Sequence, residues 1–302
     1  MSAAKAAWGL QRLTCFTITT ANLAHSARAY TEILGYQSLA ETEISATLAA
    51  HWNMPALRGV SCALLHAPAG TETILRLVEQ PDRQPGAMLL GHGWNAMEVL
   101  VQDPYVLARE LIDTAFKVLV PPRPLPFDAS IHAMQVQGPA GELLYMTALP
   151  TDRMILDLPA ARCRVDRPFI AILGGPDMAA MQRYYCALLR TAVIDPQPVL
   201  VQIVNEQFSL PADHRIPLGI VKMPRDYLIE IDELPAGAKP HPQAAGQLTR
   251  GIAMVSFEYP KLDSLDLAWL QPPRAIGEAP YRGRRTGVTL GAAGEWIELI
   301  EC

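Results

Sequence analysis

The chain has 302 residues, of which half are hydrophobic and 18% are charged. This composition is typical of a compact globular protein and excludes a disordered or fibrous chain. The net charge of -5 and the isoelectric point near 5.8 argue against a general nucleic-acid-binding protein, because phosphate contacts need clustered Lys and Arg side chains. The segment 282–285, Arg-Gly-Arg-Arg, is a local exception.

The sequence predicts a cytoplasmic protein that does not bind membranes. It has no run of about 18 apolar residues, the length needed to cross a bilayer. The first residues, Met1 to Trp8, lack the long apolar region of a secretory signal. The five cysteines are scattered, with no C-x-x-C pair, so we expect reduced thiols rather than disulfides or a zinc site.

The first module of the chain begins with apolar and β-branched residues at Leu13 to Thr20, which predict a strand. Asn22 is a suitable N-cap for a following helix, and Gly35 ends that helix. Extended segments are then predicted near Tyr36 to Thr42, Gly59 to His66 and Thr73 to Glu79. The predicted order of elements is β-α-β-β-β.

Three further modules repeat this order. The second has a strand at Asn95 to Val101, a helix from Pro104 to about Thr114, and a last strand at Leu143 to Leu149. The third has a strand at Pro168 to Leu173, a helix at Asp177 to Leu189, and a last strand at Tyr227 to Glu233. The fourth has a strand at Gly251 to Phe257, a short helical segment near Leu262 to Leu270, and a last strand after Gly294.

The modules are predicted to form two domains. The segment 151–164 carries charges and Pro without a sustained apolar period, which indicates a linker. The flanking halves, 1–150 and 165–302, are each long enough to form their own core. A single module exposes one apolar sheet face, so two modules must combine to bury it. We expect modules one and two to form the first domain, and modules three and four the second.

Two kinds of segment resemble the vicinal oxygen chelate superfamily, which contains glyoxalase I, extradiol dioxygenases, methylmalonyl-CoA epimerase and bleomycin-resistance proteins. The segment F-T-I-T-T-A-N-L-A-H-S-A-R-A-Y-T-E-I-L-G, Phe16 to Gly35, resembles its opening strand and helix. The repeated G-P-A-G-E-L-L-Y and G-A-A-G-E-W-I-E-L resemble its closing turn and strand. The resemblance covers nearly the whole chain and implies an α+β fold, with four β-α-β-β-β modules paired into two domains with curved mixed sheets. It implies no single reaction, because this fold hosts many chemistries.

The resemblance also implies positions for metal ligands, since members hold a divalent ion through a His or Gln on a module's first strand and a Glu on its last. The matching residues are Cys15, Arg76, Ala96 and Tyr145 in the first half, and Ile170, Glu230, Met254 and Glu298 in the second. The first set lacks the lone pairs that a metal needs. The second set has two carboxylates and no His, which disfavours an iron dioxygenase. We therefore expect no metal cofactor, with a weak Mg²⁺ or Mn²⁺ site at Glu230 and Glu298 as the alternative.

Glu230 and Glu298 are the predicted catalytic residues. Each lies between apolar neighbours on a closing strand, and the repeat places both strands in the same concavity. The alternative is that both carboxylates face solvent on an outer sheet surface. If they face a common cavity, repulsion and desolvation raise the pKa of one carboxyl, which gives an acid beside a carboxylate. Such a pair can move a proton next to a carbonyl.

Four other residues are predicted to contact the substrate. Tyr145 would donate a hydrogen bond to a ligand carbonyl, and Arg76 would bind a carboxylate in the concavity. Trp52 follows a predicted helix from Ile44 and would shape the cavity, and Arg285 would attract an anion. For Tyr145 and Trp52 the alternative is packing in the core, and for Arg285 it is a solvated loop.

The predicted function is that of a small-molecule lyase or isomerase, which transfers a proton or enolises its substrate next to a carbonyl without a metal. One alternative is a non-catalytic protein that binds and sequesters an apolar or aromatic compound. A second is a divergent metal-dependent enzyme like glyoxalase or the dioxygenases. Under the first hypothesis, Glu298→Gln should abolish turnover. The expected partner is a small molecule, with no nucleic acid, and the low charge permits a homodimer.

Overall fold

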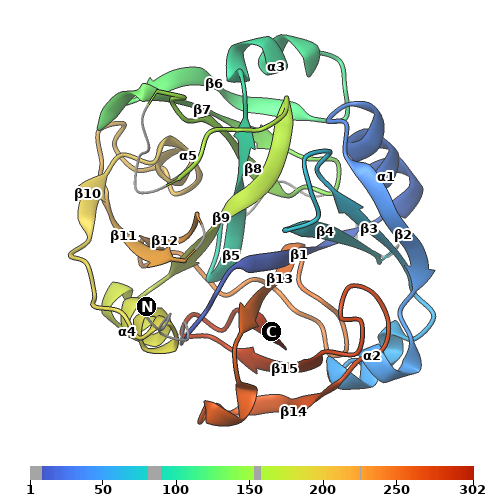
Figure 1. Cartoon of the computed structure of the whole chain (residues 1–302). Helices are drawn as coiled ribbons and strands as arrows, with labels where there is room; N and C mark the ends of the chain where they lie inside the picture. Colours follow the sequence, from blue (N-terminus) through green and yellow to red (C-terminus); the bar gives the residue numbers. More distant parts are fainter. Residues whose placement is uncertain (1–8, 81–89, 153–157, 225) are drawn as a thin grey trace, which may run out of the picture.

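The computed structural model describes residues 9–80, 90–152, 158–224 and 226–302. Met1 to Trp8 and the middle of the predicted linker, 153–157, lie outside these ranges. The described residues form two eight-stranded mixed sheets, each curved, with few helices (Figure 1). No helix in the described ranges is long and apolar enough to span a bilayer.

All four predicted modules are present. Module one contains β1 (Leu13–Thr20), α1 (Leu23–Glu32), β2 (Gln37–Glu43), α2 (Ala46–His51), the 3-10 helix η1 (Pro55–Leu57), β3 (Ser61–His66) and β4 (Ile74–Glu79). Module two contains β5 (Gly93–Val101), α3 (Pro104–Glu110), β6 (Lys117–Leu125), β7 (Asp128–Gln137) and β8 (Leu143–Ala148). Module three contains β9 (Val165–Gly175), α4 (Met178–Leu189), β10 (Gln197–Val199), α5 (Gln202–Gln207), β11 (Ile216–Met223) and β12 (Tyr227–Glu233). Module four contains β13 (Gly251–Tyr259), the 3-10 helix η2 (Leu262–Ser264), β14 (Trp269–Ala275), β15 (Arg285–Leu290) and β16 (Trp296–Glu301).

The helix that follows the first strand begins in the same way in modules one to three. The side chains of Asn22, Asp103 and Asp177 accept hydrogen bonds from backbone N–H groups in the first turns of α1, α3 and α4. In module four the prediction of a helical segment near Leu262 to Leu270 is mostly wrong. Only the short η2 forms, and Pro272 and Pro273 lie in the edge strand β14, where a missing N–H is tolerated.

Each sheet joins two modules through their first strands. β1 pairs antiparallel with β13, and β5 with β9. Within each module the last strand runs parallel to the first. Modules one and four therefore form one sheet, the outer-module sheet, and modules two and three form the other, the inner-module sheet. In Figure 1 the blue β1 lies beside the orange-red β13, from the opposite end of the chain.

This topology corrects the predicted pairing of modules one with two and three with four. The segment 151–164 connects two modules of the same sheet rather than two separate domains. Every module offers a first-strand edge that any other module can pair with. Because the entropic cost of closing a loop grows slowly with its length, chain order alone does not decide which two modules pair.

Consecutive modules are connected through their helices instead. The hydroxyl of Tyr30, in α1 of module one, donates a hydrogen bond to Glu142 of module two, with an O–O distance of 2.5 Å. The hydroxyl of Tyr185, in α4 of module three, donates to Glu295 of module four at 2.6 Å. Both acids belong to the repeated closing turn, G-P-A-G-E or G-A-A-G-E. Each tyrosine therefore links one sheet to the other.

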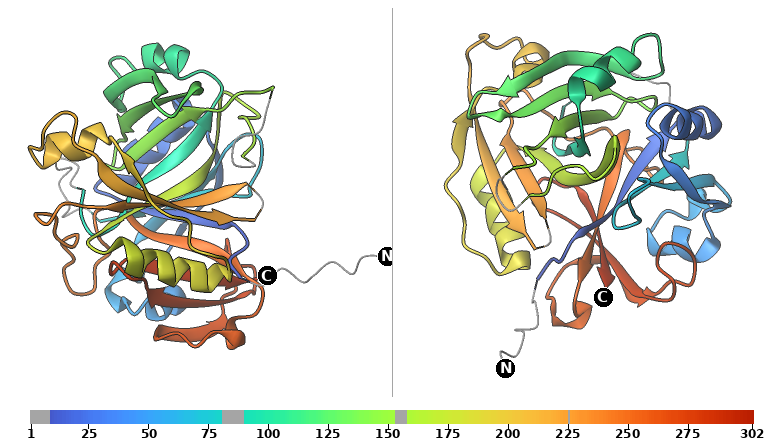
Figure 2. Two further views of the ribbon diagram at one scale, coloured as in Figure 1. Left: turned by 90° about the vertical axis from the view of Figure 1, so that its left-hand side faces the viewer. Right: turned by 45° about the horizontal axis from the view of Figure 1, so that its top comes forward.

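The two sheets pack through their apolar outer faces, with the strands of modules two and three stacked on those of modules one and four (Figure 2). The Trp94 ring centre, from β5, lies 6.0 Å from the ring centre of Phe257, from β13, and its Nε1 donates to the carbonyl of Trp296 at 2.8 Å. Since the convex face of each sheet is used for packing against the other sheet, the concave faces are left to enclose a separate concavity in each sheet.

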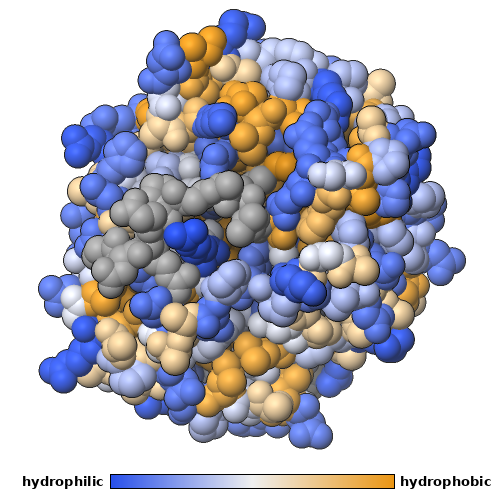
Figure 3. All heavy atoms as spheres, turned by 180° about the vertical axis from the view of Figure 1, so that it is seen from behind, coloured by the Kyte–Doolittle hydropathy of each residue, from blue (hydrophilic) through white to orange (hydrophobic). Residues whose placement is uncertain are grey.

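The distribution of apolar residues on the surface bears on the predicted homodimer. On the face shown in Figure 3, apolar residues form separate patches between polar ones. One large continuous apolar patch would indicate a permanent interface, and this face has none among its described residues. The homodimer stays a prediction.

Candidate functional site

The structure regroups the predicted site residues. Arg76 and Glu298 lie together in the concavity of the outer-module sheet, whereas Tyr145 and Glu230 lie together in that of the inner-module sheet. Glu230 is on β12 and Glu298 on β16, which belong to different sheets. The prediction that these two glutamates share one concavity is therefore wrong, because it depended on the incorrect pairing of modules.

The concavity of the outer-module sheet is filled by a buried ion-pair cluster of five residues. Nη2 of Arg76 lies 3.4 Å from Oε2 of Glu298, and both side chains are at most 1% exposed. Glu298 also accepts hydrogen bonds from Trp52 Nε1 at 3.0 Å, Tyr281 Oη at 2.7 Å and Ser256 Oγ at 2.6 Å. The Arg76 guanidinium carbon lies 4.9 Å from the Trp52 ring centre and 5.3 Å from that of Tyr281. Such distances are typical of cation–π contacts.

This cluster has the properties of a structural element rather than of an acid–base site. Burial raises the pKa of Glu298, but Arg76 and the three hydrogen-bond donors lower it by more, so the net shift is downward. The carboxylate is thus held ionised with its oxygens already bonded. The structure corrects the predicted catalytic role of Glu298 and the predicted substrate contacts of Arg76 and Trp52, since all three side chains are bonded to one another and closed off from solvent.

A divalent metal does not fit this concavity. Cys15 and Met254, the other two predicted ligand positions, are packed among apolar side chains. Burial raises the pKa of the Cys15 thiol to about 11, so it is not a thiolate at neutral pH. The guanidinium of Arg76 already neutralises Glu298 and would repel a second cation.

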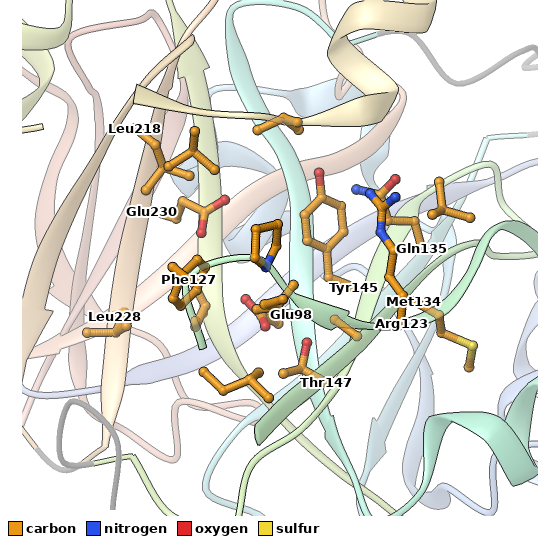
Figure 4. A pocket seen from close by; sticks show the side chains of 18 of the residues that line it. Glu98, Arg123, Phe127, Met134, Gln135, Tyr145, Thr147, Leu218, Leu228 and Glu230 are labelled. Atoms are coloured by element: carbon orange, nitrogen blue, oxygen red, sulfur yellow. The ribbon is translucent and has the colours of Figure 1, made fainter. Parts of the chain in front are cut away.

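The inner-module sheet encloses an open cavity of about 170 Å³, which we call the inner-module cavity (Figure 4). Most of its wall is apolar. It is lined by Glu98, Val120, Arg123, Leu125, Pro126, Phe127, Ile131, Ala133, Met134, Gln135, Tyr145, Thr147, Leu149, Leu158, Phe169, Ile170, Val199, Leu200, Val201, Gln202, Leu218, Ile220, Leu228 and Glu230. A concave apolar cavity with a few converging polar groups is the usual form of a small-molecule site.

Three polar residues lie on the floor of the cavity. Glu98 on β5 and Tyr145 on β8 are directly opposed in neighbouring parallel strands. Glu230 is on β12, and one strand, β9, separates it from β5. Glu98 is level with Leu228 rather than with Glu230, so a two-residue offset along the strands adds to the two strand spacings. Together they place the Glu98 and Glu230 backbones about 12 Å apart. Figure 4 shows both carboxyl groups and the Tyr145 hydroxyl directed into the cavity, which leaves room for a ligand between them.

The two glutamates differ in acidity. Burial raises the pKa of Glu98 to about 7, and the neighbouring Thr147 hydroxyl offsets only part of this rise. Burial raises the pKa of Glu230 well above its usual range, and the nearby Asp232 and Glu98 raise it further. Burial, followed by Asp232, Glu230 and Glu98, also raises the pKa of Tyr145, which keeps its proton. Once Glu98 has ionised, its charge favours the protonated form of Glu230.

Glu98 is the cavity residue on the first strand of module two, a position that the sequence analysis assigned to another residue. The predicted first-strand ligand position was Ala96, two residues earlier, which is buried and does not line the cavity. Because side chains alternate along a strand, Ala96 and Glu98 point to the same side of β5. The signal that could have identified Glu98 is an acidic residue within a mostly apolar strand, Gly93–Val101, which is buried along its whole length.

Arg285 is placed away from the cavity. It lies on β15 of the outer-module sheet, where its guanidinium makes two hydrogen bonds to the carboxylate of Asp263, at 2.7 and 2.8 Å. This fork geometry already satisfies the arginine with an internal carboxylate. The structure corrects the prediction that Arg285 binds the substrate of the site.

The donor set of the inner-module cavity does not fit a divalent metal either. Ala96 and Ile170, at the two first-strand positions, have no ligand atom. The remaining candidates are the two carboxyls that favour protonation, Glu98 and Glu230, and the phenol of Tyr145. In the part of the chain that the structure describes, no group of three His, Cys, Asp or Glu residues is arranged to hold a metal ion.

Comparison with solved structures shows the fold family. Glyoxalase I from Zea mays superposes with a TM-score of 0.62 at 13% identity, over 96% of this chain and 92% of that one. A point mutant of the same enzyme gives a TM-score of 0.66 at 14% identity, over 96% and 93%. A candidate dioxygenase from Bacillus subtilis gives 0.62 at 10% identity, over 98% and 86%. The chain thus has a glyoxalase-like fold, as the sequence resemblance implied. No protein-family model and no curated protein sequence matches the chain.

Proposed function

We propose that the protein is an enzyme, a lyase or isomerase, that moves a proton at a carbon next to the carbonyl of a small and mainly apolar substrate. The observation that carries this proposal is the pair Glu98 and Glu230, two carboxyls of unequal pKa on the floor of an apolar cavity. Two acids whose environments separate their pKa values are suited to act as base and acid at the same pH.

The floor residues have complementary roles in this reaction. Glu98, which ionises first, takes the proton from the carbon, and the electron pair of the broken C–H bond forms a C–C double bond. Glu230, still protonated, gives its proton to the carbonyl oxygen as an enol forms. The Tyr145 hydroxyl donates a hydrogen bond to the same oxygen. Glu230 takes back the enol proton as the carbonyl re-forms. Return of the Glu98 proton to the opposite face of the same carbon then gives an isomer. If instead a leaving group departs from the next carbon with its bonding electron pair, the result is a lyase reaction.

The experiment that tests this proposal is proton exchange, because it does not need the natural substrate. A panel of apolar ketones, aldehydes and 2-oxo acids is incubated with the protein in D₂O, and loss of the proton next to the carbonyl is followed by NMR. We expect exchange with at least one class of compound. Glu98→Gln and Glu230→Gln should lower its rate by about 10² to 10⁴ fold, the usual contribution of general acid–base catalysis. Glu32→Gln, at an exposed position in α1, is the matched control.

The proposal includes no metal, since the donor sets of both concavities do not fit one. Exchange should be unchanged after treatment with a chelator and after addition of Mg²⁺ or Mn²⁺. Loss of activity with the chelator, and its return with one ion, would instead support the metal-dependent alternative.

The apolar wall of the cavity favours a second candidate function, which is binding without catalysis. A protein that only sequesters a compound needs the apolar wall but not the pair of acids. Under this alternative a ligand binds with the same affinity to the wild type and to Glu98→Gln, and no carbonyl compound exchanges its proton.

A further inference from the structure

The rim of the inner-module cavity carries a cation that no described residue neutralises. Arg123, on β6, lines the cavity and is exposed. Among the described residues it has neither a hydrogen-bond partner nor an acidic partner. Figure 4 shows its side chain beside Gln135, with the guanidinium on the side of Tyr145 away from Glu230. We propose that Arg123 binds the carboxylate of the substrate, so that the substrate class is an apolar carbonyl compound with a carboxylate group. The carbonyl group of this substrate class rests on the proposed function, whereas its carboxylate group is inferred from Arg123 alone.

The segment around Arg123 is held in a fixed conformation by its sequence. Residues 120–127 read V-P-P-R-P-L-P-F, with four prolines. Each proline fixes its own φ angle and restricts the residue before it. β6 is the edge strand of the inner-module sheet, where prolines remove no internal ladder bond. The backbone that carries Arg123 therefore needs little additional ordering when a ligand binds, which improves affinity.

The rim also carries a large apolar side chain that is unusually exposed. Phe127, in the turn between β6 and β7, is 69% exposed and lines the same cavity as Leu125 and Pro126. A large aromatic side chain beside an apolar cavity gains from the approach of an apolar ligand, because that contact removes its surface from water. An arginine and an aromatic ring at one rim suit a ligand with an anionic end and an apolar body.

The charges of the cavity agree with an anionic ligand rather than a cationic one. Burial keeps Glu230 in its neutral form, so Glu98 is the one floor acid of this pair that ionises near neutral pH. The guanidinium at the rim is charged at every physiological pH and forms paired hydrogen bonds with a planar carboxylate. A positively charged ligand would instead have to pass beside Arg123.

The volume of the cavity limits the body of this ligand. An engineered apolar cavity of about 150 Å³ in another protein holds one benzene molecule. At about 170 Å³, the inner-module cavity takes a group of similar size. The matched probes are therefore phenylacetate, phenylacetamide and 2-phenylethylamine, which share one body and differ in the charge of the end group.

The test is calorimetric titration of the three probes into wild-type protein, Arg123→Gln and Arg285→Gln. The last variant removes an arginine that is paired with Asp263 on the other sheet, so it matches the change in charge without altering the rim. We expect wild type and Arg285→Gln to bind phenylacetate about tenfold more tightly than phenylacetamide. Arg123→Gln should bind both about equally, with its affinity for the amide unchanged. Raising the salt concentration should weaken only the binding of phenylacetate.

Several outcomes would overturn the inference. These are tighter binding of the amide or the amine to the wild type, a carboxylate preference that persists in Arg123→Gln, or no binding of any probe. Because Arg123 is exposed, its variant should fold, and an unchanged melting temperature confirms this. The proton-exchange experiment is independent of this one. Carboxylate binding without exchange refutes the proposed function alone, and exchange without a carboxylate preference refutes the role of Arg123 alone.

Discussion

The guanidinium of Arg76 and the carboxylate of Glu298 face each other at 3.4 Å inside the outer-module sheet, fully enclosed by protein. The corresponding positions of the inner-module sheet are Tyr145 and Glu230, and they line an open cavity. Two concavities of the same fold thus have different roles in this chain. One is closed by an internal ion pair and supports the structure, and the other is available to a small molecule.

We expect Arg76→Met to destabilise the protein by about 3 to 5 kcal/mol, because it leaves the buried Glu298 carboxylate without a counter-charge. Glu298→Leu should also destabilise it, because it leaves the buried Arg76 guanidinium without a counter-charge. In Arg76→Met/Glu298→Leu both charges are absent, and much of the loss should be recovered. Urea denaturation of the four proteins measures these differences. A double variant as unstable as the sum of the two single variants would show that the charges are not coupled.

The Glu98 and Glu230 pair predicts the pH dependence of catalysis. The base, Glu98, must be ionised, so kcat/KM should rise as the pH increases through about 7. The acid, Glu230, must be protonated, so activity should fall again at higher pH, where it ionises. The result is a bell-shaped profile, measured with any compound that the exchange experiment identifies. Glu98→Gln should remove the acidic limb. If that limb persists in the residual activity of Glu98→Gln, a different group is the base.

The fold could be predicted from the sequence because each module carries strong local signals. The strand at Leu13 to Thr20 and the Asn22 cap determine neighbouring elements of module one. The repeated G-E closing turn determines the last strands of modules two and four. Which modules share a sheet could not be predicted in the same way. That choice depends on contacts between first-strand edges such as β1 and β13, more than 200 residues apart, and all four edges have similar apolar sequences.

The predicted site residues lie in different parts of the structure. Glu230 and Tyr145 do line a cavity, and the closing-strand pattern was sufficient to select them. Glu298 has the same local sequence pattern, I-E-L or I-E-I, yet it is bonded to Arg76. Its role depends on a partner from the other end of the chain, which a strand pattern does not reveal. Glu98 was not among the predicted site residues because the matched position, Ala96, was two residues too early. Arg123 was not among them because the proline-rich edge strand that carries it has no recognisable motif.

The buried acids also predict that part of the folding stability depends on pH. Burial raises the pKa of Asp232 in the folded protein to about 7, whereas an unfolded Asp has its ordinary value near 4. The folded state then binds more protons than the unfolded state between these values, so this contribution to stability is present at low pH and is lost as the pH rises toward 7. Asp232→Asn has no such loss. It should match the wild type near pH 4 and be more stable by about 1 to 3 kcal/mol at pH 8.

Urea denaturation of the wild type and Asp232→Asn from pH 4 to pH 8 measures this difference. Asp195→Asn, at an exposed position, is the control and should follow the wild type at every pH. A difference between Asp232→Asn and the wild type that does not change with pH would mean that Asp232 does not titrate in this range.

The two tyrosines that connect consecutive modules should contribute equally to stability. Tyr30→Phe removes the hydrogen bond to Glu142, and Tyr185→Phe the one to Glu295, in each case at a buried carboxyl. Loss of one partner of a buried polar group costs about 1 to 3 kcal/mol. Tyr105→Phe removes a bond from an exposed tyrosine to His132 within module two, and should cost much less. Combining Tyr30→Phe with Glu142→Gln should cost less than the sum of the single changes, because both remove the same contact. Equal effects of Tyr30→Phe and Tyr105→Phe would show instead that this repeated contact between the sheets does not stabilise their packing.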